Sequence, residues 1–133
     1  MWAIFVWVPR GFVCTVRSTQ IVRVLITVTP RMYREALALA VHRHHPGFEV
    51  RIAPPTESEE EVSSFRPHLL VHNDNDGLDQ RLLSGVPCWV EVLYSDSMDA
   101  KIGVKGSVSQ VSDISMNDLS RVLNEAEELI SEA

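Results

Sequence analysis

The sequence lacks the features that would assign it to a disulfide-rich, membrane or metal-binding class. Of its 133 residues only two are cysteines, Cys14 and Cys88, and neither has a second cysteine or a histidine at metal-ligand spacing. No apolar run approaches the roughly 20 residues that a membrane-spanning helix needs. The sequence therefore predicts reduced thiols, one of them buried, in a cytoplasmic protein with no membrane partner.

Signatures of catalysis are missing as well. The chain has no Gly-rich phosphate loop, no nucleophile elbow with Ser, His and Asp in order, and no Cys–His signature. Internal repeats and low-complexity linkers are also missing. We therefore expect a protein that is not an enzyme and that uses no cofactor.

The charge is acidic overall and unevenly distributed. The formal net charge is −6. Residues 1–45 contain six arginines and one acid, Glu35, for a charge of about +5, whereas the remainder carries about −11. An acidic protein has no general electrostatic attraction to nucleic acid. We therefore expect no nucleic-acid partner.

The chain is long enough for one domain with a substantial core, and its first 20 residues differ from the rest. The run Trp2–Val8 is apolar, but it is too short for a membrane span and poor as a signal peptide. It is an extra strand, a weak membrane anchor, or upstream sequence from a misassigned start codon. We favour the last, because the domain pattern begins at Ile21. The sequence thus predicts an N-terminal extension over 1–20 and a domain over 21–133.

Strand-like and helix-like patterns alternate along residues 21–95. Four runs have the length and composition of strands: "IVRVLITV" (21–28), "FEVRIA" (48–53), which reads as an edge strand, "RPHLLVHN" (66–73) and "PCWVEVLYS" (87–95). Helical patterns separate them, and Thr29 and Thr56 are expected to cap the first two helices. This order, β-α-β-α-β-(α)-β, predicts a three-layer α/β fold with a mostly parallel, flavodoxin-like sheet.

The pattern changes after residue 95. Only nine residues, Asp96–Val104, precede the pair Lys105-Gly106, and nine are too few for a helical crossover. The stretch "AKIGVKGSVSQV" instead predicts a β-hairpin that turns at Lys105-Gly106. A C-terminal helix follows, which Ser115 caps. Its apolar stripe for the core consists of Leu119, Val122, Leu123, Ala126, Leu129 and Ile130.

Three stretches carry a resemblance to a known family. "RVLITVTPRMYREAL" is a strand that runs directly into a helix, "RPHLLVHND" is a buried strand followed by "GLD", and "DLSRVLNEAEEL" is a closing helix. Together they resemble the receiver domain of bacterial two-component response regulators over residues 23–125. The likeness lies in the pattern of elements, and it implies a flavodoxin-like fold and a role in signal transduction.

The resemblance also implies where a phosphorylation site would lie. A receiver has a Mg²⁺-binding pair of acids after its first strand, a phospho-accepting Asp at the end of the third, and a Thr or Ser after the fourth. At these positions the chain has Thr27 and Thr29 without an acid, Asn73 with Asp74 one residue late, and Ser95. We therefore expect these five residues to form a degenerate pocket that holds no metal and transfers no phosphoryl group.

These observations predict a non-catalytic pseudo-receiver, a regulatory domain that contacts a protein partner or a second copy in a homodimer. One alternative is a small-ligand-binding module at the carboxyl ends of the first and third strands, formed by Thr27, Thr29, Asn73 and Asp74. Another is an atypical receiver that accepts a phosphoryl group on Asp74.

Two other polar groups have simpler interpretations than a functional site. His42 and His44 are interpreted as a solvated helix end, and His68 and His72 lie on or near the third strand, so that these histidines are not expected to form a zinc site. Glu91 lies among apolar residues, where a carboxylate can have a raised pKa. We expect that it faces water instead, from a fourth strand near the edge of the sheet.

Overall fold

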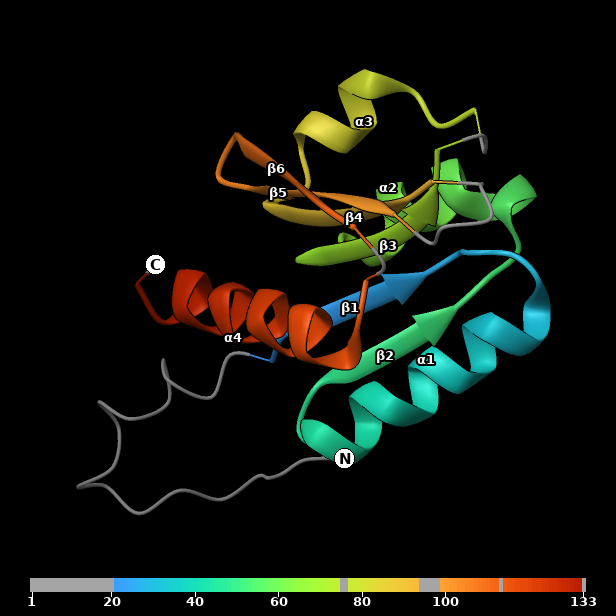
Figure 1. The fold of residues 1–133 in the computed structure, drawn as a ribbon. Coiled ribbons are helices and arrows are strands. Elements are labelled where there is room, and N and C mark those ends of the chain that lie inside the picture. The colour runs from blue at the N-terminus through green and yellow to red at the C-terminus, as the bar shows by residue number, and fades with distance from the viewer. Residues whose placement is uncertain (1–20, 75–76, 94–98, 113, 133) are drawn as a thin grey trace, which may run out of the picture.

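One β-sheet with helices on both faces makes up the described part of the protein, residues 21–74, 77–93, 99–112 and 114–132, in a computed structural model (Figure 1). The alternation of strands and helices confirms the predicted α/β class. In chain order the elements are β1 (Arg23–Ile26), α1 (Arg31–His44), β2 (Glu49–Ile52), the 3-10 helix η2 (Pro55–Glu57), α2 (Ser58–Phe65), β3 (Leu69–Asn73), α3 (Gln80–Ser84), β4 (Cys88–Val92), β5 (Ala100–Val104), β6 (Ser107–Val111) and α4 (Met116–Glu132).

The sheet combines a parallel part with an antiparallel part. Its strand order is β2-β1-β3-β4-β5-β6, and the first four strands in this order are parallel. β5 and β6 are antiparallel to their neighbours. The predicted parallel sheet is therefore found in part, because the chain returns from β4 without a helical crossover.

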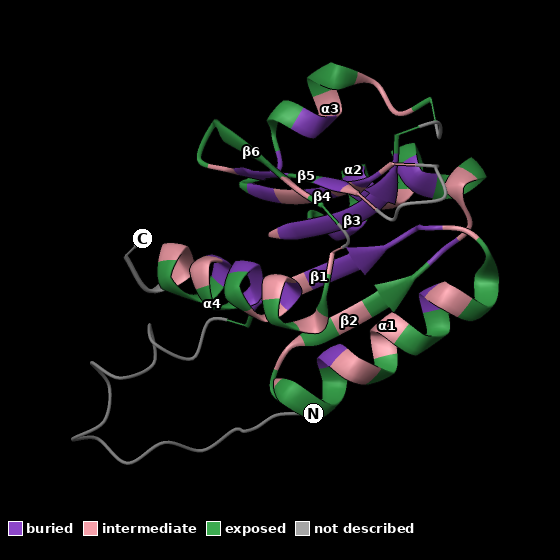
Figure 2. Cartoon of the chain, viewed as in Figure 1, coloured by how far each residue is buried: buried purple, intermediate pink, exposed green. Residues whose placement is uncertain are grey.

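β3 is the most buried strand. All five residues of Leu69–Asn73 are buried, because the strand has a neighbour on each side and helices over both faces. The edge strands β2 and β6 are mostly exposed, as Figure 2 shows. The predicted edge position of residues 48–53 is thus confirmed.

The alternation of side chains along the strands divides the core into two parts. On one face, Val24 and Val71 belong to a cluster that includes residues of α1 and α4. On the other face, Leu25 and Leu70 pack with residues of α2 and α3. Full burial of each such side chain stabilises the fold by about 1.5–3 kcal/mol relative to exposure. Among the described residues, no helix is both long enough and apolar enough to cross a bilayer.

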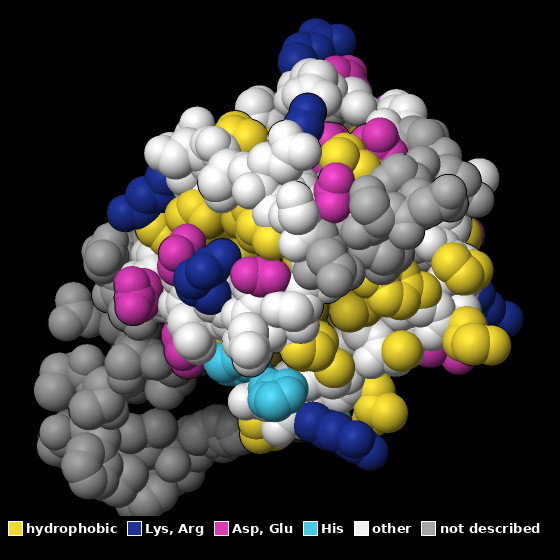
Figure 3. Space-filling model, viewed as in Figure 1, with side chains coloured by type: hydrophobic (Ala, Val, Ile, Leu, Met, Phe, Trp, Pro, Cys, Tyr) yellow, Lys and Arg dark blue, Asp and Glu magenta, His cyan; other side chains and the backbone are white. Residues whose placement is uncertain are grey.

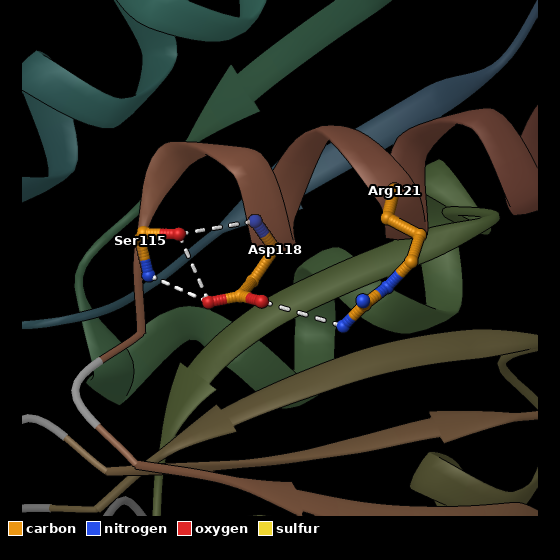
Figure 4. A network of polar contacts seen from close by, with 3 residues as sticks. All are labelled: Ser115, Asp118 and Arg121. Atoms are coloured by element: carbon orange, nitrogen blue, oxygen red, sulfur yellow. Dashed lines mark hydrogen bonds and ion pairs between the residues drawn. The ribbon is translucent and has the colours of Figure 1, made fainter.

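Ser115 caps α4, as the sequence predicts (Figure 4). The Asp118 N–H donates to Ser115 Oγ at 3.3 Å, and the Ser115 N–H donates to Asp118 Oδ2 at 2.9 Å. The Ser115 hydroxyl also donates to Asp118 Oδ2. The bonds that the Ser115 backbone and hydroxyl donate to this carboxyl group lower its pKa. The Arg121 guanidinium lies 3.3 Å from the same carboxylate. The reciprocal bonds satisfy backbone N–H groups that the first turn of a helix leaves unpaired.

The two other predicted caps are wrong. α1 begins after Pro30 without a side-chain cap, and the Thr29 hydroxyl donates to Asn73 Oδ1 instead. α2 also begins without the Thr56 cap, because the 3-10 helix Pro55–Glu57 leads into it. In the first case a partner far along the chain takes the hydroxyl, and a local sequence motif cannot reveal such a competitor.

The hairpin of β5 and β6 turns at the predicted pair. Lys105 and Gly106 have φ values of 52° and 85°, which a two-residue type I′ turn requires. Within β5, Gly103 lies directly opposite Trp89 of β4. A Cβ atom at Gly103 would lie 2.2 Å from the Trp89 indole. The missing side chain is therefore what lets the indole lie against β5.

Arg23 connects the start of β1 to the residues before β3. Its N–H donates to His68 Nδ1 at 2.9 Å, and its guanidinium donates to the Arg66 carbonyl at 2.8 Å. An imidazole accepts a hydrogen bond at Nδ1 only when that nitrogen carries no proton. Burial and the nearby Arg23 charge lower the pKa of His68, in agreement with a neutral ring.

Gly103→Ala is expected to reduce the free energy of unfolding by about 1–3 kcal/mol, because the new methyl group forces the indole out of its place. Urea unfolding measures the change. Gly47→Ala is the control, since a Cβ there meets no atom within 4 Å. If both variants unfold alike, the close approach of Trp89 to β5 is not a constraint.

The His68 interaction is expected to make stability depend on pH. Because the folded-state pKa is lowered, the folded protein binds fewer protons than the unfolded chain, whose value is about 6.5. The contribution is thus complete above that pH and is lost as the pH falls through the folded pKa. His68→Asn keeps an acceptor and removes the titration, so urea unfolding from pH 7.5 to 5 should show a shallower decline. Equal declines would contradict this role.

Candidate functional site

Asn73 connects the carboxyl ends of three strands at the edge where the predicted pocket lies. It is the last residue of β3 and is only 3% exposed. Its Oδ1 accepts the Thr29 N–H at 2.7 Å and the Thr29 hydroxyl at 3.1 Å. Its Nδ2 donates to the Val92 carbonyl, at the end of β4, at 3.3 Å. We call Thr29, Asn73 and Val92 the Asn73 clamp.

The clamp requires an amide side chain. A carboxylate accepts hydrogen bonds but donates none, so an aspartate would lose the bond to Val92 and turn a negative oxygen toward its carbonyl. The receiver resemblance places a phospho-accepting carboxylate at this position, and an amide does not supply that nucleophile. In the structure Asn73 instead holds strands together.

Asp74 and Thr27 differ in their surroundings. Asp74 follows the end of β3 and is exposed, and its N–H donates to the Val92 carbonyl at 3.2 Å. Thr27 is fully buried, and the alternation of side chains along a strand places it on the face of Leu25, against α2 and α3. Within the described ranges its hydroxyl has no hydrogen-bond partner.

Ser95 lies outside the described residues. Of the other four predicted pocket residues, the structure brings the side chains of Thr29 and Asn73 together and separates them from that of Thr27. Ligand binding by this set stays a prediction. The two residues that meet use their polar groups on each other.

A buried ion-pair geometry that the sequence analysis missed lies on the opposite face. His72 is 2% exposed, and its Nε2 is 3.8 Å from Glu91 Oε2 across β3 and β4. His72 lies on β3, inside the strand that the sequence predicts. The edge position expected for Glu91 is wrong, because β4 has β5 beyond it and Glu91 is only 16% exposed. His72 lies two residues after Leu70 in an apolar strand, so the two side chains share one face of the sheet. This spacing was the signal in the sequence that His72 is buried.

The chemistry of this second group is limited by burial. Thr27, His72 and Glu91 follow one another across β1, β3 and β4 on one face of the sheet. Thr27 has no exposed surface, so no substrate reaches its hydroxyl in this state. In the described part of the chain, no three potential metal-binding side chains gather in one place. The arrangement supports the sheet and shows no accessible nucleophile.

Comparison with known proteins does not extend this picture. No protein-family model, no curated protein and no solved structure matches the chain.

Replacing Asn73 with aspartate is expected to reduce the free energy of unfolding by about 1–3 kcal/mol at pH 7, the usual cost of leaving a buried polar group without its partner. Thermal or urea unfolding measures the loss. Asn117→Asp makes the same chemical change at an exposed residue of α4, where a change of at most about 0.5 kcal/mol is expected. A stable Asn73→Asp variant would contradict the clamp.

Proposed function

We propose that the protein is a non-catalytic, receiver-like regulatory domain that acts through protein contacts. The strand order β2-β1-β3-β4 supports it, because flavodoxin-like domains place their first four strands in this order. The distribution of helices, with α1 and α4 on one face and α2 and α3 on the other, is also compatible with such a fold. The antiparallel β5 is the departure from the pattern.

The Asn73 clamp is the observation that carries the non-catalytic part of the proposal. At the position of the phosphorylated aspartate the chain has an amide whose oxygen and nitrogen are both engaged by the protein. The chain also has no acid at Thr27 to Thr29 to hold Mg²⁺. The same hydrogen bonds weigh against a ligand pocket built from Thr29 and Asn73.

β6 is the surface that we assign to protein contacts. Residues Ser107–Val111 form an edge strand with no charged side chain and no proline, and Val108 is 60% exposed. Proteins usually protect such an edge with charges, proline or a bulge, because its backbone groups are a template for another strand. An edge without charge or proline is suited to pair with one.

A second copy of the chain is the partner that fits this edge best. Antiparallel pairing centred on Ser109 places Ser107 opposite Val111 and Val108 opposite Gln110, so that no like charges meet. The chain as a whole has a net charge of −6, so two copies repel each other at long range, and an uncharged edge is where this repulsion is smallest. A two-fold contact of this kind is closed and gives a dimer.

Incubation with Mg²⁺ and acetyl phosphate tests the non-catalytic part. Intact-mass spectrometry is expected to show no species heavier by about 80 Da, the mass of one phosphoryl group, because the carboxylate site is missing. Asp74→Asn is run in parallel. A heavier species that this substitution removes would mean that Asp74 is a phospho-acceptor and would overturn the proposal.

Sedimentation velocity over a range of concentrations tests the dimer. The wild-type chain is expected to dimerise, and Val108→Lys to weaken dimerisation at least tenfold, because each copy then brings a charged side chain, opposite Gln110 of the other copy, into an edge that has no charge. Met32→Lys makes the same charge change on α1, where Met32 is 80% exposed, and should leave it unchanged. A wild-type monomer, or equal effects of both variants, would exclude the β6 dimer.

A further inference from the structure

On one face of the sheet the two covering helices, α1 and α4, lie over different strands. α1 packs on β1 and β2, whereas α4 packs on β5. Neighbouring strands are about 4.8 Å apart, so β1 and β5 are separated by about 14 Å, while helices in contact have axes only about 8–10 Å apart. The space between α1 and α4 therefore lies over β3 and β4.

Side chains do not fill this space completely. A hollow of about 310 Å³ remains between α1, the start of α4 and the sheet. Figure 3 shows hydrophobic side chains on this side of the molecule, in the region that Figure 1 places between the two helices. The lining is mostly apolar and includes Ser115 at the start of α4. Its residues are Tyr33, Leu37, Val71, Val90, Val92, Ile114, Ser115, Met116 and Leu119.

Tyr33 gives the hollow a polar group. It is half-buried on α1, and removal from water raises the pKa of its phenol, so the hydroxyl stays protonated at neutral pH and is able to donate. No described residue forms a hydrogen bond with this hydroxyl. A phenol on a residue that lines an apolar hollow is a hydrogen-bond donor available to a ligand in that space.

We infer that the hollow between α1 and α4 binds a small, largely apolar molecule with one hydrogen-bond acceptor, which Tyr33 holds. Its volume lies at the lower end of the 300–1,000 Å³ typical of ligand pockets. It has room for roughly ten water-sized volumes of about 30 Å³, too little for a helix about 10 Å in diameter. Aromatic ketones of about ten non-hydrogen atoms represent this ligand class.

This site is separate from the β6 edge, and it shares only Val92 with the clamp, which uses the carbonyl of that residue. Val71 and Val90 are in the middle of their strands, on the face covered by α1 and α4. Neither a dimer through β6 nor a phosphorylated Asp74 is needed to form the hollow. An experiment that contradicts the proposed function would therefore not contradict the ligand site. An experiment that contradicts the ligand site would likewise not contradict the proposed function.

A pair of matched probes tests the inference on the full chain. Acetophenone carries a carbonyl acceptor, and cumene has the same number of non-hydrogen atoms without one. In a methyl-detected NMR titration, both are expected to shift the methyl signals of Val71, Val90 and Leu119. The methyl signals of Leu25 and Leu70, on the opposite face, should stay in place. No shift, or equal shifts on both faces, would overturn the site.

Tyr33→Phe separates the phenol from the apolar walls. It is expected to weaken the binding of acetophenone about three- to tenfold, the value of one net hydrogen bond. Cumene should bind as before, because it makes no bond to the hydroxyl. If the variant weakens both probes equally, or neither, Tyr33 does not hold the ligand as inferred.

A filling substitution provides the second test. Leu37→Trp places a larger side chain in the hollow and is expected to abolish the shifts caused by either probe. Leu39→Trp introduces the same residue two positions away on α1, where the side chain is 52% exposed and does not define the hollow. It should leave binding unchanged. Retained binding in a folded Leu37→Trp protein would place the probes elsewhere and overturn the inference.

Discussion

The hydrogen bonds of Asn73 are the constraint on which the arrangement of the strand ends depends, at the carboxyl edge of β1, β3 and β4. Parallel strands end side by side, and their last residues have backbone groups that no further strand residues pair. One amide side chain accepts from Thr29 and donates to Val92, so the ends of β1, β3 and β4 are held at fixed spacing. The same bonds engage both polar atoms of the Asn73 side chain within the protein.

The hairpin of β5 and β6 has consequences on two sides of the molecule. It ends the parallel part of the sheet after β4 and exposes β6 as an uncharged edge. The chain continues from β6 into α4, and α4 packs on β5 rather than beside α1. The uncharged edge and the hollow over β3 and β4 follow from this single change of direction. The proposed dimer contact and the proposed ligand site both depend on it.

Part of the site was visible in the sequence and part was not. The absence of acids near Thr29 and the amide at Asn73 were readable from the residues and the receiver resemblance. The partner of Thr29 was not, because a Thr-Pro pair before a helix is also typical of a cap and the competing acceptor lies 44 positions away. The His72–Glu91 contact was missed for a related reason. Whether β4 lies inside the sheet or at its edge depends on strand order, which no local pattern encodes.

Features determined by neighbours along the chain were therefore fixed by the sequence alone. The Lys105-Gly106 turn, the Ser115 cap and the apolar stripe of α4 each need only residues that are close in sequence, and each is found where expected. Tertiary structure decided the Asn73 clamp, the glycine required opposite Trp89 and the hollow over β3 and β4. These depend on which strands and helices become neighbours, because atoms distant in sequence compete for the same hydrogen bonds and the same space.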